Sequence, residues 1–286
     1  MTLAPALAPA GAAPSCSTLL ASAYRRLSAL CDALCLELAE PRAPAGQGWI
    51  DGAELASRPE LLDAFLDEED RRIRERYAVT ARPDVVASRA LHGLLWSAAL
   101  LMSGPWYLER RVPRLRPAQF LLRRTGNGCA VVPGGFSCLP DDPAAGLPGV
   151  RVVPGPESLR AELRAAVADH VRPVLAAIGP RARRGPRALW GMVTDDLVSG
   201  IWYLGRMLGE EERAVREAGD LLPGAVGPYP GGAAFRRLTG RTGDAYPTRT
   251  RTGCCLFYAI RPAEPCVTCP RTDEAERLRR LEGTPF

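Results

Sequence analysis

Residues 251–270 read RTGCCLFYAIRPAEPCVTCP and contain four of the nine cysteines in the chain. Cys254 and Cys255 are adjacent, ten residues separate them from Cys266, and Cys269 completes a CxxC pair. Four thiols within so short a segment need a common explanation. Three are available: an iron-sulfur cluster, a structural zinc ion or disulfide bonds.

Disulfide bonds are the least favoured explanation, because nine cysteines in 286 residues are too sparse for a disulfide-stapled secreted domain and their odd number leaves one unpaired. Zinc sites made of four thiolates are usually built from two CxxC turns, and only the second cysteine pair has that form. Adjacent cysteines suit a centre with two metal atoms better, since neighbouring thiolates then need to converge only loosely. The spacing therefore favours a two-iron two-sulfide (2Fe-2S) cluster and leaves zinc as the alternative.

On this interpretation Cys254, Cys255, Cys266 and Cys269 are the metal ligands and form the redox centre. Gly253 precedes the adjacent pair, and we expect it to relax the backbone where the two thiols must be aimed.

Arginine is abundant around these cysteines, and it supplies all 37 basic residues of the chain. Positive charge stabilises the more negative, reduced form of a cluster and attracts anionic partners. Arg251 lies nearest in sequence to the first cysteine pair. We therefore predict that Arg251 tunes the cluster potential or contacts the substrate or a partner.

Length and composition set the class of protein. A chain of 286 residues with 47% apolar and 24% charged positions is long enough for one large globular domain or two small ones. The net charge of +5 is too small to indicate nucleic-acid binding. The apolar stretch 91–108 is interrupted by Gly104 and Pro105, so we expect a buried helix and no transmembrane segment.

The first residues lack the basic and apolar segments of a signal peptide. We therefore predict a cytoplasmic protein without nucleic-acid partners, and leave open a peripheral contact with the inner face of the cell membrane.

Apolar residues recur at helical spacing in several segments, and Asn127-Gly128 is a typical hairpin turn. We expect a hairpin between residues 118 and 132, a short strand near residue 150, and helices at 17–40, 59–77, 84–102, from 158 onward, and at 187–208. The predicted fold class is α+β, mainly helical with a small antiparallel sheet and a C-terminal cysteine-rich iron-sulfur segment. Residues 1–16 form a flexible tail, residues 17–230 the helical body, and residues 231–286 the cluster segment packed on that body.

Isolated cysteines and histidines have simpler explanations. Cys31 and Cys35 lie four residues apart on one face of the predicted helix 17–40, among leucines, and we expect both in the core. The chain has only two histidines, so the sequence does not indicate a histidine-based metal site or catalytic triad. His92 is expected in the core and His170 on a helix surface.

The segment from Arg251 to Pro270 resembles the C-terminal signature of the FhuF-type ferric-siderophore reductases, bacterial proteins in which a CC-x10-CxxC arrangement holds a 2Fe-2S cluster. Arg251 and Tyr258 also match family positions. Upstream, LWGMVTDDLVSGIWYLGRML is similar to the family's tryptophan-containing helix, and ARPDVVASRALHGLLWSAALLM to its apolar helix. Ala259 and Met192 depart from the family pattern, which often has arginine and asparagine there.

This resemblance implies that the protein reduces siderophore-bound Fe(III) to Fe(II) and releases the iron in the cytoplasm. Hard hydroxamate or catecholate oxygens hold the ferric ion far better than the ferrous ion, so one electron opens the chelate. The sequence lacks nucleotide- and flavin-binding motifs, so the electron must come from an external donor such as a ferredoxin, a flavodoxin or a flavin reductase. Two alternatives stay open: a structural zinc ribbon that binds nucleic acid, and a 2Fe-2S redox sensor or electron carrier without siderophore specificity.

Overall fold

The computed structural model describes residues 15–32, 34–40 and 48–283. The described helices are α1 (Cys16–Leu30), α2 (Gly52–Ser57), α3 (Pro59–Tyr77), α4 (Pro83–Glu109), α5 (Pro156–Ala182), α6 (Pro186–Met207), α7 (Glu211–Leu221) and α8 (Glu274–Gly283), with 3₁₀ turns at Pro117–Gln119 and Phe257–Ala259. The described strands are β1 (Leu36–Leu38), β2 (Trp49–Asp51), β3 (Val112–Pro113), β4 (Phe120–Arg123), β5 (Cys129–Val131), β6 (Phe136–Cys138), β7 (Val150–Val152), β8 (Arg236–Thr239) and β9 (Ala245–Thr248). The predicted mainly helical α+β class is confirmed.

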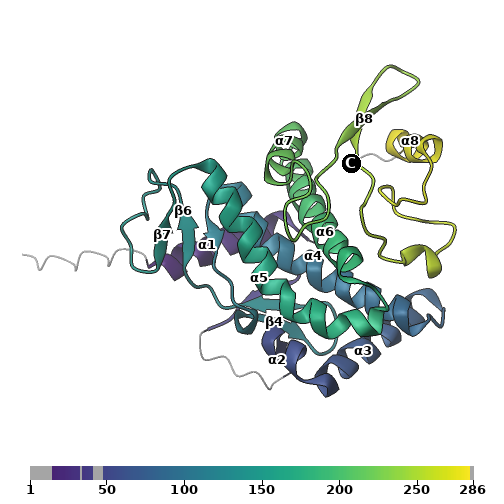
Figure 1. The fold of residues 1–286 in the computed structure, drawn as a ribbon, viewed down its shortest axis with the longest axis horizontal. Coiled ribbons are helices and arrows are strands. Elements are labelled where there is room, and N and C mark those ends of the chain that lie inside the picture. Colours follow the sequence, from purple (N-terminus) through teal and green to yellow (C-terminus); the bar gives the residue numbers. More distant parts are fainter. Residues whose placement is uncertain (1–14, 33, 41–47, 284–286) are drawn as a thin grey trace, which may run out of the picture.

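Helices α4, α5 and α6 lie side by side in the centre of the molecule (Figure 1). By length and composition alone, α4 is the described helix that could cross a membrane, but 72% of its most apolar stretch is buried inside the protein. Pro83 and Asp84 suit its first turn, where a proline loses no hydrogen bond and an acidic side chain favours the helix dipole. The expected buried helix in this region is confirmed.

Three small sheets surround the helices. The first has the order β1-β5-β4-β2, the second β3-β6-β7, and the third is the β8–β9 pair. The expected hairpin is confirmed, because β4 pairs antiparallel with β5 across the Asn127-Gly128 turn. The pairs β1–β5 and β6–β7 are parallel, and sequence spacing did not predict them.

The predicted helix 17–40 is wrong beyond its midpoint. Helix α1 ends at Leu30, and the chain then pairs with the hairpin, where Cys129 N donates to Cys35 O at 2.9 Å. Cys31 is buried as expected, but Cys35 is exposed. The open edge of β5 supplies backbone hydrogen bonds that outweigh the local helical pattern. Of the predicted tail, residues 1–14 lie outside the described residues, whereas Cys16 begins α1.

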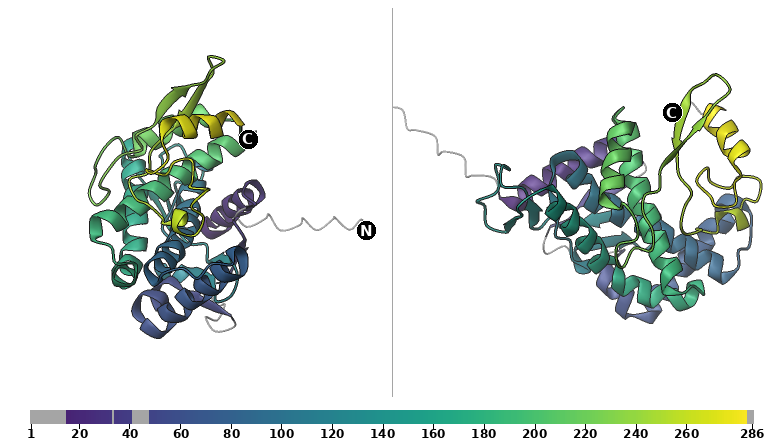
Figure 2. Two further views of the ribbon diagram at one scale, coloured as in Figure 1. Left: turned by 90° about the vertical axis from the view of Figure 1, so that its right-hand side faces the viewer. Right: turned by 45° about the horizontal axis from the view of Figure 1, so that its top comes forward.

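The C-terminal segment packs along α6 and against the neighbouring ends of α3 and α4 (Figure 2). Ile260 lies in a small apolar cluster with Ile73, Val85 and Val86, and Leu256 packs against it. Burial of these aliphatic side chains fixes the loop that carries the cysteines against the helical body.

His170 was expected on a helix surface, and this expectation is wrong. Its side chain on α5 is only 4% exposed, because the Leu115 backbone and the Phe120 ring cover it. The Nδ1 atom lies 3.1 Å from the carbonyl oxygen of Leu115, to which a protonated Nδ1 donates. Burial lowers the pKa of His170 from 6.5 to about 4.

A pH dependence of stability follows from His170. In the unfolded chain the imidazole takes up a proton near pH 6.5, whereas in the folded protein it does so only near pH 4. Stability contributed by neutral His170 is therefore complete above pH 6.5 and is lost as the pH falls toward 4, by up to roughly 1.4 kcal/mol per pH unit. Urea unfolding at several pH values gives the free energy of unfolding as a function of pH. Between pH 4 and 6.5 this free energy should change less steeply with pH in His170→Gln than in the wild type. An unchanged slope would contradict this assignment.

Candidate metal centre

The four cysteines of the tail lie in the loop between β9 and α8. All four are free thiols; Cys255 and Cys269 are buried, and Cys254 and Cys266 are half-buried. Leu256 N donates to Cys254 Sγ at 3.4 Å, and Arg271 N donates to Cys269 Sγ at 3.5 Å. Backbone N–H groups that point at sulfur favour thiolates over thiols.

The two cysteine pairs face each other. A hydrogen bond from the Cys266 thiol lowers the pKa of Cys255 and raises that of Cys266, so the thiolate of this pair is favoured at Cys255. Charges on His92, Arg89 and Arg251 also lower the pKa of Cys255. The structure thus provides neighbouring sulfurs in a cationic environment, and this donor set fits a metal centre with thiolate ligands.

A site for a single tetrahedral ion is not preformed. Among the described residues, no three histidine, cysteine, aspartate or glutamate side chains gather closely enough to hold one metal ion. A binuclear centre instead takes two thiolates at each of two metal atoms, so its four sulfurs lie further apart than those around one zinc ion. Two opposed pairs of cysteines fit a centre of two metal atoms, with two thiolates at each.

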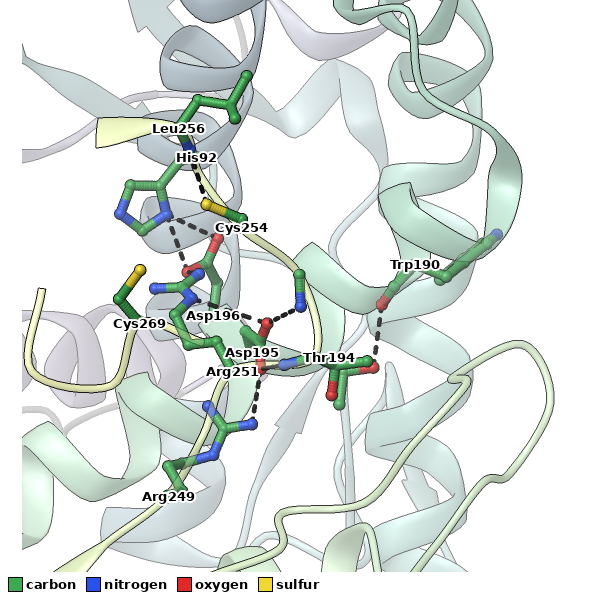
Figure 3. A network of polar contacts seen from close by, with 12 residues as sticks. His92, Trp190, Thr194, Asp195, Asp196, Arg249, Arg251, Cys254, Leu256 and Cys269 are labelled. Atoms are coloured by element: carbon green, nitrogen blue, oxygen red, sulfur yellow. Dashed lines mark hydrogen bonds and ion pairs between the residues drawn. The ribbon is translucent and has the colours of Figure 1, made fainter. Parts of the chain in front are cut away.

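Two adjacent aspartates on α6 anchor the start of this segment (Figure 3). Asp195 is fully buried and accepts three hydrogen bonds: from Arg249 Nη2 at 2.6 Å, Thr252 N at 2.9 Å and Gly253 N at 2.6 Å. Arg249 is itself fully buried and also donates to Ala233 O. One carboxylate therefore holds both a side chain and the backbone immediately before the first cysteine pair.

Asp196, the next residue, connects the segment to α4. Arg251 Nη2 donates to its carboxylate at 2.7 Å, and His92 Nδ1 lies 2.9 Å from it. Burial raises the pKa of Asp195 despite its arginine partners. For Asp196, burial acts in the same direction, but the charges of His92 and Arg251 outweigh it and the pKa is lowered. Asp196 is therefore the more firmly ionised of the two carboxylates.

Sequence reasoning expected His92 in the core, and this needs correction. Its side chain is 19% exposed and belongs to the polar network at the start of the cysteine segment. Arginines that precede the first cysteine pair differ in their surroundings. Arg236 and Arg237 form ion pairs with partly exposed side chains at the surface, whereas Arg249 and Arg251 are buried against the aspartates.

Gly253 has a different role from the one expected. Its φ is not in the left-handed region; the positive φ of this segment, 59°, belongs to Leu256. A Cβ at Gly253 would lie 2.9 Å from Met192 N and 3.1 Å from the carbonyl carbon of Gly191. Glycine is needed here because the loop approaches the backbone of α6 too closely for a side chain.

Arg277 of α8 fixes the backbone of the second cysteine pair. The side chain is 1% exposed, and its guanidinium donates to the carbonyl oxygens of Val267 (2.8 Å), Cys269 (2.9 Å) and Thr272 (3.2 Å) and to Thr250 Oγ1 (2.9 Å). Four acceptors around one buried cation fix the CxxC turn.

Sequence reasoning singled out Arg251 and the four cysteines, and the structure brings all five into one region. It missed Asp195, Asp196 and Arg277. A usable signal was present for the aspartates, because two adjacent carboxylates in an otherwise apolar helical stretch are rarely buried without cationic partners. No comparable signal marked Arg277 among the many arginines of the tail.

We expect Asp195→Asn to lower the free energy of unfolding by about 3–5 kcal/mol, because the isosteric amide leaves Arg249 as a buried charge without its carboxylate. Asp63→Asn is the matched control, since Asp63 pairs with Arg181 at an exposed position. The free energy of unfolding of Asp63→Asn should fall by less than about 1 kcal/mol. Urea unfolding of both variants provides the comparison, and equal losses would show that the buried pair is not a structural anchor.

Comparison with protein families identifies the segment. The model of the family described as FhuF 2Fe-2S C-terminal domain matches residues 251–271, a stretch that starts at Arg251 and includes all four tail cysteines. A comparison with curated proteins gave no match. The match confirms the resemblance of the C-terminal segment and gives this segment a 2Fe-2S cluster as its cofactor. The chain therefore carries, at residues 251–271, the 2Fe-2S C-terminal domain of the FhuF family.

Proposed function

We propose that this protein is a cytoplasmic ferric-siderophore reductase, in which Cys254, Cys255, Cys266 and Cys269 hold the 2Fe-2S cluster. The FhuF 2Fe-2S match at residues 251–271 is the observation that carries this proposal. The opposed thiol pairs, the N–H groups directed at two sulfurs and the buried arginines nearby support it.

The proposed reaction is a one-electron transfer. A bound 2Fe-2S cluster supplies single electrons. Siderophore-bound iron takes up one electron and changes from Fe(III) to Fe(II), and no covalent bond to the protein forms. The hard oxygen ligands then release the softer ferrous ion. An external one-electron donor, such as a ferredoxin, a flavodoxin or a flavin reductase, returns one electron for each iron reduced.

The chain's own residues hold the cysteines in place during this reaction. Asp195 and Asp196 fix the backbone and Arg251 before the first pair, and Arg277 fixes the turn of the second pair. Buried cations near the thiolates also favour the reduced, more negative state. Cys254 and Cys266 are half-buried, so one side of the cysteine loop is close to solvent and to an incoming acceptor.

Stopped-flow reoxidation tests the proposal. The protein is reduced and mixed with several ferric siderophores in the presence of a ferrous trap, while visible absorbance follows the cluster. We expect reoxidation by ferric siderophores with stoichiometric trapping of Fe(II). Reoxidation that does not depend on the siderophore would indicate an electron carrier, and a colourless zinc protein would contradict the cluster assignment. Cys266→Ser should lose colour and turnover together, while Cys35→Ser, at an exposed position outside the loop, should keep both.

Arg277→Met should loosen the second cysteine pair, because three backbone carbonyls lose a charged donor. With an iron chelator present, we expect visible absorbance to bleach at least about tenfold faster than in the wild type, since each charge-assisted hydrogen bond contributes about 1.5–3 kcal/mol. Arg279→Met is the control on the same helix, because its side chain is 72% exposed. Equal bleaching rates in the two variants would show that Arg277 does not hold the turn.

A further inference from the structure

A cavity of about 500 Å³ lies between α3, α4 and the β4–β5 hairpin. This volume is within the usual range of small-molecule sites. Apolar and aromatic side chains form part of the wall, among them Phe65, Leu94 and Trp96. No residue of the cysteine loop lines this cavity, nor does any residue given a role in the proposed reaction.

Positive charge dominates the cavity wall. Four arginines line it (Arg72, Arg76, Arg89 and Arg123), against two glutamates (Glu69 and Glu75). Glu69 pairs with Arg72, and Glu75 pairs with Arg71, which does not line the cavity. Within the described part of the chain, Arg76 and Arg89 have no ion-pair partner, and each guanidinium lies over an aromatic ring. Arg89 also acts electrostatically on Glu69. With four arginines against two glutamates, the wall keeps an excess of two positive charges for a ligand of negative charge.

The cavity adjoins the cluster segment. Arg89 lies 5.2 Å from the centre of the Phe257 ring, and the Tyr77 ring, also on the cavity wall, lies 5.8 Å from it. Phe257 follows Cys255 by two residues, so both contacts join the cavity wall to the cysteine loop. A molecule in this cavity is therefore separated from the cysteine loop by little more than one layer of side chains.

Gly93 of α4 lines the cavity and has open space where a side chain would stand. It lies within the long helix α4, where glycine costs about 1 kcal/mol relative to alanine, and a Cβ built there meets no atom within 4 Å. A side chain at this position would project into open space beside the cavity without a clash. The position therefore offers a way to obstruct the cavity and leave the packing of α4 intact.

We propose that this cavity binds the ferric substrate and selects chelates of net negative charge through Arg76 and Arg89. The proposal rests on the proposed reductase function and adds the place and the charge class of the substrate. Trp96 and Phe65 contact the apolar or aromatic parts of the chelate, and the Arg89–Phe257 contact keeps the bound iron near the cluster segment.

Calorimetric titration of the cluster-containing protein with gallium(III) chelates measures binding without reduction, because Ga(III) accepts no electron under these conditions. The anionic probe is the gallium complex of a tripodal tris-catecholate, which carries three negative charges. The cationic probe is the gallium complex of a linear tris-hydroxamate with a free amine, which carries one positive charge. We expect the anionic probe to bind at least about tenfold more tightly. Equal affinities, or displacement of the anionic probe by an equal concentration of inorganic phosphate, would overturn the proposal.

Two variants locate the site. Arg76→Glu and Gly93→Leu should each weaken binding of the anionic probe at least about tenfold while the visible spectrum of the cluster stays unchanged. Arg216→Glu and Gly219→Leu are matched controls: Arg216 is an exposed arginine and Gly219 a helical glycine with open space at its Cβ, both on α7 away from the cavity. Wild-type affinity in both cavity variants would overturn the assignment of the site.

The same variants separate this proposal from the proposed function. If reduced Gly93→Leu protein is reoxidised by anionic ferric chelates at the wild-type rate, the cavity is not the substrate site and the reductase function stands. If gallium probes bind as expected but no ferric chelate reoxidises the wild-type protein, the cavity is a binding site and the reductase function fails.

Discussion

The buried carboxylate pair Asp195–Asp196 is the interaction on which the candidate site depends. Two adjacent charges without solvent are strongly unfavourable unless cations and hydrogen-bond donors surround them. Here the partners come from the cysteine segment itself: two arginines and two backbone N–H groups, with His92 completing the shell from α4. Without residues 249–253, the two buried carboxylates of α6 would lack most of their cationic and hydrogen-bonding partners. This requirement fixes the backbone directly before the first cysteine pair.

A second buried cation acts at the other end of the loop. Arg277 lies beyond the matched family segment, yet its guanidinium satisfies three carbonyl oxygens in and after the CxxC turn. The two cysteine pairs are thus positioned by different elements, the first by α6 and the second by α8. Because a binuclear centre needs both pairs at a fixed separation, the packing of α8 and α6 is part of the metal site even though neither helix supplies a thiol.

Arginines at the cysteine loop and at the neighbouring cavity connect the structure with the proposed chemistry. Positive charge near thiolates stabilises the anionic ligands, and positive charge on the neighbouring cavity attracts an anionic chelate. Arg89 links the two places, since it lines the cavity and lies over the Phe257 ring, two residues after Cys255. In the proposed function, one arginine-rich region serves both the cofactor and the substrate.

Local sequence patterns were enough to predict the cysteine segment, the hairpin and the central buried helix. The CC-x10-CxxC spacing located the cysteine segment and favoured a 2Fe-2S cluster over zinc. Asn127-Gly128 marked the hairpin, and the apolar run in α4 predicted a buried helix, because thiol spacing, turn conformation and helical periodicity are properties of short stretches. Tertiary structure alone decided the rest. The parallel pairing that turned residues 36–38 into a strand, the burial of His170, the aspartates that receive Arg249 and Arg251, and the cavity wall shared by α3, α4 and the hairpin all join residues far apart in the chain. Such contacts depend on which backbone edges and charges remain unsatisfied after the helices pack, and no local pattern contains that information.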